Sequence, residues 1–149
     1  MIVNYKKLND RAVEPIKGSE YAAGLDLCAL IQNGAHAQRI PAGATVKIGT
    51  GIAMEIPEGY FGAVFARSGM ATNRGLRPAN CVGVIDSDYR GEIIVALHND
   101  SEKCETIHDG DRVAQLVIMP CLDVQLSVVD NLNNTERGSG GFGSTGTSV

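Results

Sequence analysis

The sequence predicts an all-β fold, because of its apolar pattern and its turn signals. Short segments rich in β-branched residues follow one another, and the turn residues of 41–43 and 57–59 separate some of them. The continuous apolar runs 93–97 and 116–119 are too short for helices, so we expect strands that are buried on both faces. Strands at this even spacing, without helices between them, indicate a sandwich, a jelly roll or a barrel.

Each expected strand corresponds to a run of this composition. The segment 60–66 leads directly into Arg67, and only residues 68–76 favour a helix, of one or two turns. The expected strands are, in chain order, 2–8, 25–31, 45–49, 51–56, 60–66, 81–85, 92–98, 112–119 and 124–129.

The chain has the composition of one ordinary globular domain. It has 149 residues, 44% of them hydrophobic, and a net charge of −4. The clear compositional break comes near residue 131, so we expect a domain over 1–130 and a mobile C-terminal arm over 131–149. No apolar run is long enough to cross a membrane, and the acidic balance argues against nucleic-acid binding.

The cysteines and the N-terminus indicate the compartment. Cys28, Cys81, Cys104 and Cys121 are widely spaced, three of them among apolar neighbours, and we expect buried free thiols rather than a zinc site. The first residues lack the order of a secretory signal. We therefore expect a cytoplasmic protein.

Three arginines occur in residues 67–77, a segment without any acidic residue. Arg67 follows a predicted strand and precedes Ser68 and Gly69, so a cation, a hydroxyl and a backbone amide come together at a strand end. Arg74 and Arg77 fit two descriptions equally well: phosphate-binding groups, or side chains that are solvated or paired with carboxylates across a subunit contact.

Residues 80–92 have the pattern of a reactive hairpin. Asp86 directly follows Val84 and Ile85, so its carboxylate begins at the edge of an apolar surface, where it could orient and deprotonate a water molecule. Turn formation is the alternative for Asp86 and the preferred explanation for Asp88, because aspartate stabilises turns through its own backbone.

Residues 137–149 are rich in glycine and hydroxyl groups, with a single arginine and a single aromatic ring. Such a segment is a flexible tail by composition, yet it holds the groups that a nucleoside phosphate binds. Arg137 offers a cation, the glycine amides can approach an anion, Ser144 and Thr145 offer hydroxyls, and Phe142 offers a stacking face.

Five segments, in order, resemble the five motifs of the trimeric dUTPase family. They are 23–29, 66–71, 80–92, 110–117 and 137–146, and together they span most of the chain. Each is weak alone, but all five in this order are specific. The resemblance implies a jelly-roll-like β-barrel with one short helix and a glycine-rich C-terminal arm. It also implies a dUTP diphosphatase, which limits uracil incorporation into DNA and supplies dUMP for thymidylate synthesis.

The resemblance also implies a role for each site residue. Asp86 would activate the water that attacks the α-phosphorus of dUTP, with Mg²⁺ across the phosphates. Asp26 would contact the metal through water, or else anchor its strand. Gln115 would contact phosphate, or else make a structural hydrogen bond. The phosphate-contacting set would be Arg67, Ser68, Gly69 and Gln115.

Base and sugar selection follow from the same resemblance. The uracil edge would pair with Asn80 and the backbone of Gly83, Val84 and Ile85. Tyr89 would pack under the deoxyribose and exclude a 2′-hydroxyl. The protein would be a homotrimer whose sites are shared between subunits. The arm would close over the nucleotide through Arg137, Phe142, Gly143, Ser144 and Thr145.

Two alternatives stay open at this point. One is a dCTP deaminase or a bifunctional dCTP deaminase and dUTPase, which needs a catalytic glutamate and a different region after the hairpin. The segment 90–92 follows the hydrolase pattern instead. The other is a nucleotide-binding protein that regulates a partner.

Overall fold

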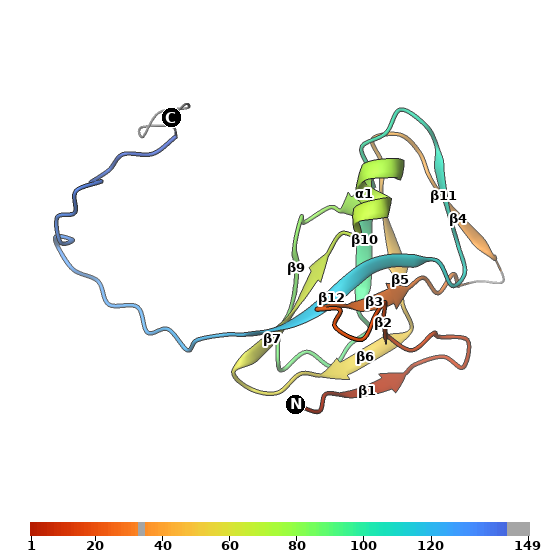
Figure 1. The fold of residues 1–149 in the computed structure, drawn as a ribbon, viewed down its shortest axis with the longest axis horizontal. Helices are drawn as coiled ribbons and strands as arrows, with labels where there is room; N and C mark the ends of the chain where they lie inside the picture. The colour runs from red at the N-terminus through yellow and green to blue at the C-terminus, as the bar shows by residue number, and fades with distance from the viewer. Residues whose placement is uncertain (33–34, 143–149) are drawn as a thin grey trace.

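The all-β prediction is confirmed by the computed structural model, which describes residues 1–32 and 35–142 (Figure 1). One short helix, α1 (Ser68–Arg74), interrupts the described strands, and it is far too short to span a membrane. The strands are β1 (Asn4–Lys7), β2 (Ile16–Lys17), β3 (Leu25–Cys28), β4 (Ala37–Ile40), β5 (Thr45–Gly49), β6 (Ile52–Glu55), β7 (Tyr60–Phe65), β8 (Leu76–Pro78), β9 (Gly83–Ile85), β10 (Ile94–Asn99), β11 (Glu105–His108) and β12 (Arg112–Pro120).

The described strands form four antiparallel sheets. The largest has the order β2-β3-β12-β7-β9, and a three-stranded sheet has the order β5-β10-β8. Two-stranded pairs, β1-β6 and β11-β4, complete the set. Because β12 lies at the centre of the largest sheet, it pairs with both β3 and β7. These two strands are distant from β12 in the sequence.

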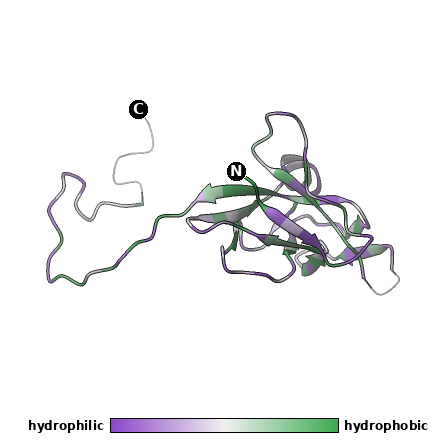
Figure 2. Ribbon diagram, turned by 90° about the horizontal axis from the view of Figure 1, so that it is seen from below, coloured by the Kyte–Doolittle hydropathy of each residue, from purple (hydrophilic) through white to green (hydrophobic). Residues whose placement is uncertain are grey.

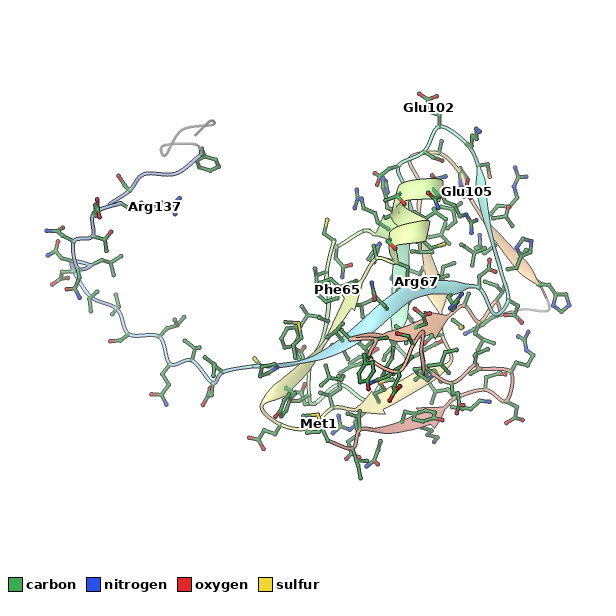
Figure 3. The ribbon with its side chains drawn as sticks, viewed as in Figure 1. Met1, Phe65, Arg67, Glu102, Glu105 and Arg137 are labelled. Carbon is green, nitrogen blue, oxygen red and sulfur yellow. The ribbon has the colours of Figure 1, made fainter. Side chains whose placement is uncertain are left out.

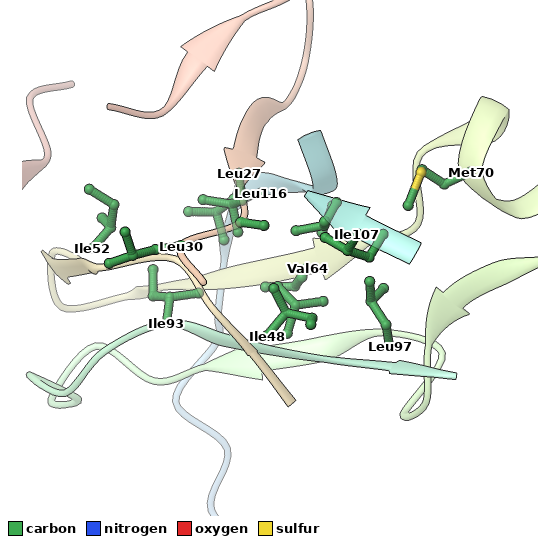
Figure 4. Close-up of a cluster of buried hydrophobic side chains, with 14 of the residues drawn as sticks. Leu27, Leu30, Ile48, Ile52, Val64, Met70, Ile93, Leu97, Ile107 and Leu116 are labelled. Atoms are coloured by element: carbon green, nitrogen blue, oxygen red, sulfur yellow. The ribbon is translucent and has the colours of Figure 1, made fainter. Parts of the chain in front are cut away.

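One hydrophobic core lies between the two larger sheets (Figure 4). Leu27, Val64 and Leu116 come from the five-stranded sheet, and Ile48 and Leu97 face them from the three-stranded sheet. Most of these side chains are fully buried, each contributing roughly 1.5–3 kcal/mol of transfer free energy. This core fixes the ends of β7, from which the candidate site is built.

The helix α1 begins at Arg67, whose backbone is extended, and ends at Gly75. Gly75 has a φ of 65°, and a Cβ there would lie 3.0 Å from the backbone nitrogen of Ser101. Only glycine meets both conditions without strain. Met70 buries its side chain in the core, so the helix start is held in place beside β7.

Several expectations about strands are corrected. Residues 124–129 form no strand in the single chain, because their alternating apolar side chains have no neighbouring strand to pair with. The strands β2, β4, β8 and β11 were not expected, since they are short or polar and are defined by pairing rather than by composition.

The expectation of strands buried on both faces is also wrong for the single chain. Along β10 the burial alternates, and Ile94 is 48% exposed; at the end of β12, Met119 is 37% exposed. Within one chain each sheet packs on one face only, so apolar residues remain on the outer face.

Of the cysteines, only Cys28 is buried. Cys81, Cys104 and Cys121 are exposed free thiols, which corrects the expectation that they lie in the core. Cys81 lies in a bend, Cys104 lies just before β11 and Cys121 lies just after β12, where the side chains reach solvent.

Candidate functional site

The predicted phosphate-contacting residues meet where β3, β12 and β7 lie side by side. Asp26 on β3 is opposite Gln115 on β12, and Gln115 is opposite Phe65 on β7, two residues before Arg67. The register of three strands therefore joins three distant sequence segments at one place (Figure 3).

Asp26 forms the centre of this group. Its carboxylate is 8% exposed and accepts a hydrogen bond from Arg67 Nε at 2.9 Å and one from Arg112 Nη1 at 3.1 Å. Arg67 also donates to the carbonyl of Arg112 at 3.3 Å. Two guanidinium groups and one carboxylate leave an excess of one positive charge, which suits a phosphate.

Asp26, Arg67 and Arg112 together form an arginine cluster. Ser68 and Gly69 are exposed at the start of α1, directly beside this cluster. The Ser68 carbonyl accepts the Thr72 hydroxyl at 2.7 Å, and this bond holds the first turn of the helix. The sequence prediction that a cation, a hydroxyl and a backbone amide share this strand end is confirmed.

Gln115 makes a structural hydrogen bond, one of the two alternatives for it. Its Nε2 donates to the carbonyl of Ala66 at 2.9 Å. A Cβ on Gly24 would lie 3.0 Å from its Oε1, so glycine at position 24 leaves room for the amide. Gln115 thus ties β12 to the residue before Arg67, and contact with phosphate stays a prediction.

Arg74 and Arg77 are paired with carboxylates in the same chain. Arg74 Nε lies 2.7 Å from Glu105 Oε2, and its Nη2 donates to the carbonyl of Thr106. Arg77 Nε lies 2.6 Å from Asp100 Oδ2, and this hydrogen bond raises the pKa of the Arg77 guanidinium. The structure thus shows ion pairs, but within one chain rather than across the expected subunit contact.

In the structure the predicted hairpin, residues 80–92, is an edge strand followed by a turn, because β9 pairs with β7 and not with β10, which lies in the three-stranded sheet. Strand β9 pairs with β7, with Gly83 opposite Val64 and Ile85 opposite Gly62. A Cβ at Gly83 would lie 3.1 Å from Val64 Cβ and 3.3 Å from Asn80 Nδ2, so glycine lets Asn80 fold close to the strand. Asn80, Val84 and Tyr89 are exposed, as a nucleotide-binding surface requires.

Asp86 lies where β9 ends, and its carboxylate is exposed to solvent. The Asp86 carbonyl accepts the Tyr89 N–H at 3.2 Å, which closes the turn 86–89. Asp86 also lines an open pocket beside Tyr60, Phe61 and Ser87. Among the hydrogen bonds of the described residues, none uses the Asp86 carboxylate, so its oxygens could accept hydrogen bonds from a water molecule.

The arginine cluster and Asp86 lie at opposite ends of β7. Continuing the register beyond Ile85 and Gly62 places Asp86 beside Phe61, six residues before Arg67. At the rise of an extended strand, six residues correspond to about 20 Å. One chain alone does not bring these two groups to the same phosphate.

The C-terminal arm runs away from the body of its own chain (Figure 1). Arg137 Nε donates to the carbonyl of Gly140 at 3.0 Å, and Phe142 is fully exposed. In this conformation Arg137 lies far from Arg67 and the body of the chain (Figure 3). Gly143, Ser144 and Thr145 lie outside the described residues.

The described residues offer no group of three or more histidine, cysteine or acidic side chains that could hold a metal ion. The two Asp26 oxygens accept hydrogen bonds from cationic groups, which disfavours direct binding of a metal cation there. This arrangement supports the strand-anchoring alternative for Asp26. It is compatible with a metal ion that is bound to the phosphates of a nucleotide and keeps its water ligands.

Arg112 was missed as a member of the site. It lies three residues before Gln115 in one of the recognised segments. An arginine two residues after a glycine turn does not by itself indicate a binding site. The pairing of β12 with β3 would have indicated it, because the register places Arg112 beside Cys28, near Asp26.

Comparisons with known proteins agree with this geometry. The dUTPase family profile matches residues 10–146. The deoxyuridine 5′-triphosphate nucleotidohydrolase of Desulfitobacterium hafniense is 51% identical over 128 residues, 85% of this chain and 83% of that protein. The protein of the same name from Idiomarina loihiensis is 44% identical and covers 98% of both chains.

The solved structures confirm the jelly-roll-like fold. A mutant dUTPase of Staphylococcus bacteriophage 80alpha, solved with dUpNHpp, matches with a TM-score of 0.88 and 27% identity over 98% of this chain and 99% of that one. A dUTPase mutant of phage phi11, described with a structural Mg(II) ion, has a TM-score of 0.79 at 23% identity, over 90% of this chain and all of that one.

The match to the family profile therefore spans all five recognised segments, and the relatives cover nearly the whole chain. Both the strand register and these relatives point to one conclusion: the chain belongs to the dUTPase family of nucleotide hydrolases.

Proposed function

We propose that this dUTPase hydrolyses dUTP to dUMP and pyrophosphate, with Asp86 activating the water that attacks the α-phosphorus. The observation that carries the proposal is the exposed Asp86 carboxylate at the end of β9, where it also lines a pocket. A carboxylate in that position can accept a proton from water as the new bond to phosphorus forms.

A lone carboxylate is a weak base, so the charge of the triphosphate must be neutralised by other groups. The arginine cluster supplies fixed positive charge, and Ser68 and Gly69 supply donors beside it. Mg²⁺, bound to the phosphates and to water, would add charge neutralisation, with Asp26 contacting it only through water. The same positive groups would also stabilise the negative charge of the departing pyrophosphate.

We further propose a homotrimer with shared sites. Asp86 and the arginine cluster are about 20 Å apart along β7, so a site with both groups requires residues from neighbouring chains. Residues 122–128, which come before the arm, also show alternating apolar side chains that are exposed in the described chain (Figure 2). Leu122, Val124, Leu126 and Val128 are 67–98% exposed, which favours burial against another subunit.

In this assembly the folded domain would comprise residues 1–130, and 131–149 would be the arm that closes over a nucleotide. Residues 121–130 would belong to the domain because their apolar side chains pack on a neighbour. Phe142 would stack on uracil, and Arg137, Gly143, Ser144 and Thr145 would contact the γ-phosphate.

The hairpin would select the nucleotide. Asn80 and the backbone of Gly83, Val84 and Ile85 would pair with the uracil edge, and the exposed ring of Tyr89 would pack under the deoxyribose. The enzyme would thereby limit uracil in DNA and supply dUMP for thymidylate synthesis. Three exposed free thiols favour the reducing cytoplasm as its location.

The deaminase alternative is disfavoured by the position of Glu92. Its Oε1 accepts the Gly51 N–H at 2.7 Å, so this carboxylate stabilises the backbone before β6. A catalytic glutamate would need that carboxylate directed at a substrate instead.

The deciding experiment measures pyrophosphate release from dUTP, dCTP, dTTP and UTP, each with Mg²⁺ and with a chelator. The proposal expects magnesium-dependent release from dUTP and little from the other three nucleotides. Release of ammonia from dCTP would identify a deaminase, and equal release from all four would contradict selection by the hairpin.

A further inference from the structure

Gly91 lies directly beneath the ring of Tyr89. A Cβ added at Gly91 would lie 2.4 Å from the Tyr89 hydroxyl, 2.6 Å from Cζ and 3.1 Å from Cε2. A Cβ carbon is essentially never found within 3.0 Å of such an atom, so the ring occupies space that only glycine leaves empty. The two residues are therefore in direct contact across the turn.

The backbone of Gly91 gives no other reason for a glycine. Its φ does not fall in the left-handed region, in contrast to Gly43 with a φ of 70°. An alanine at position 91 would thus be free of backbone strain. What it would change is the space available to the Tyr89 ring.

The ring is held in this position by one hydrogen bond. The Tyr89 hydroxyl donates to the carbonyl of Glu92 at 3.0 Å, and the residue is 43% exposed. The hydrogen bond keeps the hydroxyl end of the ring against Gly91 while much of the residue stays accessible to solvent. A side chain at 91 would break this bond and push the ring outward.

The rest of the turn is fixed independently of the ring. Arg90 Nη1 donates to the carbonyls of Ser87 at 2.6 Å and of Tyr89 at 3.0 Å, and the Asp86 carbonyl accepts the Tyr89 N–H. These bonds use backbone atoms and the Arg90 guanidinium, and they do not involve the Tyr89 side chain. A collision at 91 would therefore move the ring and leave Asp86 in place.

We propose that Gly91 is a positioning residue for sugar selection: the missing side chain sets the plane of the Tyr89 ring, and that plane excludes a 2′-hydroxyl. This inference depends on the proposed role of Tyr89 under the deoxyribose. It adds that selection between dUTP and UTP depends on a residue that does not touch the nucleotide.

The test compares kcat/KM for dUTP and for UTP in Gly91→Ala. The ratio of the two values should fall by roughly tenfold to a hundredfold, because one lost steric contact has about that effect on discrimination. The Gly43→Ala variant is the control for general destabilisation, because a φ of 70° strains an alanine at that position. It introduces the same methyl group at a remote turn with nothing within 4 Å, and its ratio should stay at the wild-type value.

A double-mutant cycle separates a role through the ring from a general structural effect. In the Tyr89→Ala background the ring is absent, so adding Gly91→Ala should leave the ratio unchanged. If Gly91→Ala alone fails to fold, the double variant should recover the melting temperature of Tyr89→Ala. That recovery would itself show that the ring and the new methyl group collide.

Two results would overturn the inference. One is an unchanged dUTP to UTP ratio in folded Gly91→Ala while the wild-type enzyme selects dUTP. The other is an equal effect of Gly91→Ala with and without the Tyr89 ring. A wild-type enzyme that hydrolyses UTP as well as dUTP would instead refute the role of Tyr89, and this inference with it.

Discussion

Two aspartates of the site differ at the residue scale in burial and in contacts. Asp26 is 8% exposed and bound by two arginines, whereas Asp86 is exposed and contributes only its carbonyl to a described hydrogen bond. A paired buried carboxylate contributes to stability, while an exposed unpaired one can exchange protons with water. Substitution of Asp26 should therefore mainly lower stability, and substitution of Asp86 should mainly lower turnover.

Replacing Asp86 should affect catalysis and leave folding intact. In Asp86→Asn, turnover of dUTP should fall by about 100-fold or more, because the base is lost, while dUTP still binds. Asp88→Asn, in the same turn, is the control and should keep most of the activity. Steady-state kinetics and a binding titration measure both effects, and an Asn variant with more than about a tenth of wild-type turnover would show that Asp86 is not the base.

Replacing Asp26 should mainly affect stability. Asp26→Asn leaves Arg67 and Arg112 without their carboxylate, and we expect a loss of about 1–3 kcal/mol in the free energy of unfolding. Asp100→Asn breaks the exposed pair with Arg77 and should cost at most about 1 kcal/mol. Urea unfolding compares the two variants, and equal losses would mean that burial of Asp26 adds nothing.

At the scale of the element, each strand contributes a residue to the site through its register. Gly83 opposite Val64 fixes the hairpin against β7, and Gln115 opposite Asp26 fixes β12 against β3. A shift of one residue in either pairing would turn the functional side chains to the other face of the sheet. Cys28, at the end of β3, reports on this packing because its thiol is buried.

The burial of Cys28 predicts a pH dependence of stability. Burial, with the nearby Asp26 charge, raises the pKa of the Cys28 thiol, so the folded state holds this proton more tightly than the unfolded state. The stabilisation is present below the ordinary thiol pKa and is lost as pH rises through the folded pKa. Denaturant unfolding across alkaline pH should show this decline, and Cys28→Ala should show a smaller slope. Identical slopes would contradict the expected coupling.

For the whole molecule, the separation of Asp86 from the arginine cluster along β7 is the main argument for the proposed trimer with shared sites. The outer face of β10, the end of β12 and residues 122–128 all present exposed apolar side chains. These surfaces and the arm that leaves its own body favour a site completed by neighbours (Figure 1).

Mixed trimers test the shared site directly. A variant truncated before Arg137 should stay folded, with a melting temperature within a few degrees of wild type, but should lose most activity. After subunit exchange with Asp86→Asn, some activity should return, because a hybrid site can combine one intact arm with one intact base. The exchange itself is verified by native mass spectrometry. Exchange without any recovery would argue that the arm acts on its own subunit.

The residue types and their order along the chain determined much of this protein in advance. Apolar runs of strand length predicted most of the long strands, and the five segments predicted the family, because chemistry-bearing residues such as Asp86 and Arg67 are visible in the sequence. Pairing could not be predicted from these patterns. The polar strand β11 and the short β8 exist because neighbours supply their hydrogen bonds, and the exposed 124–129 is no strand because a single chain supplies none. Register also decided the site: it brought Arg112 to Asp26 and placed Asp86 at the far end of β7, since backbone hydrogen bonds between distant segments fix distances that sequence spacing does not contain.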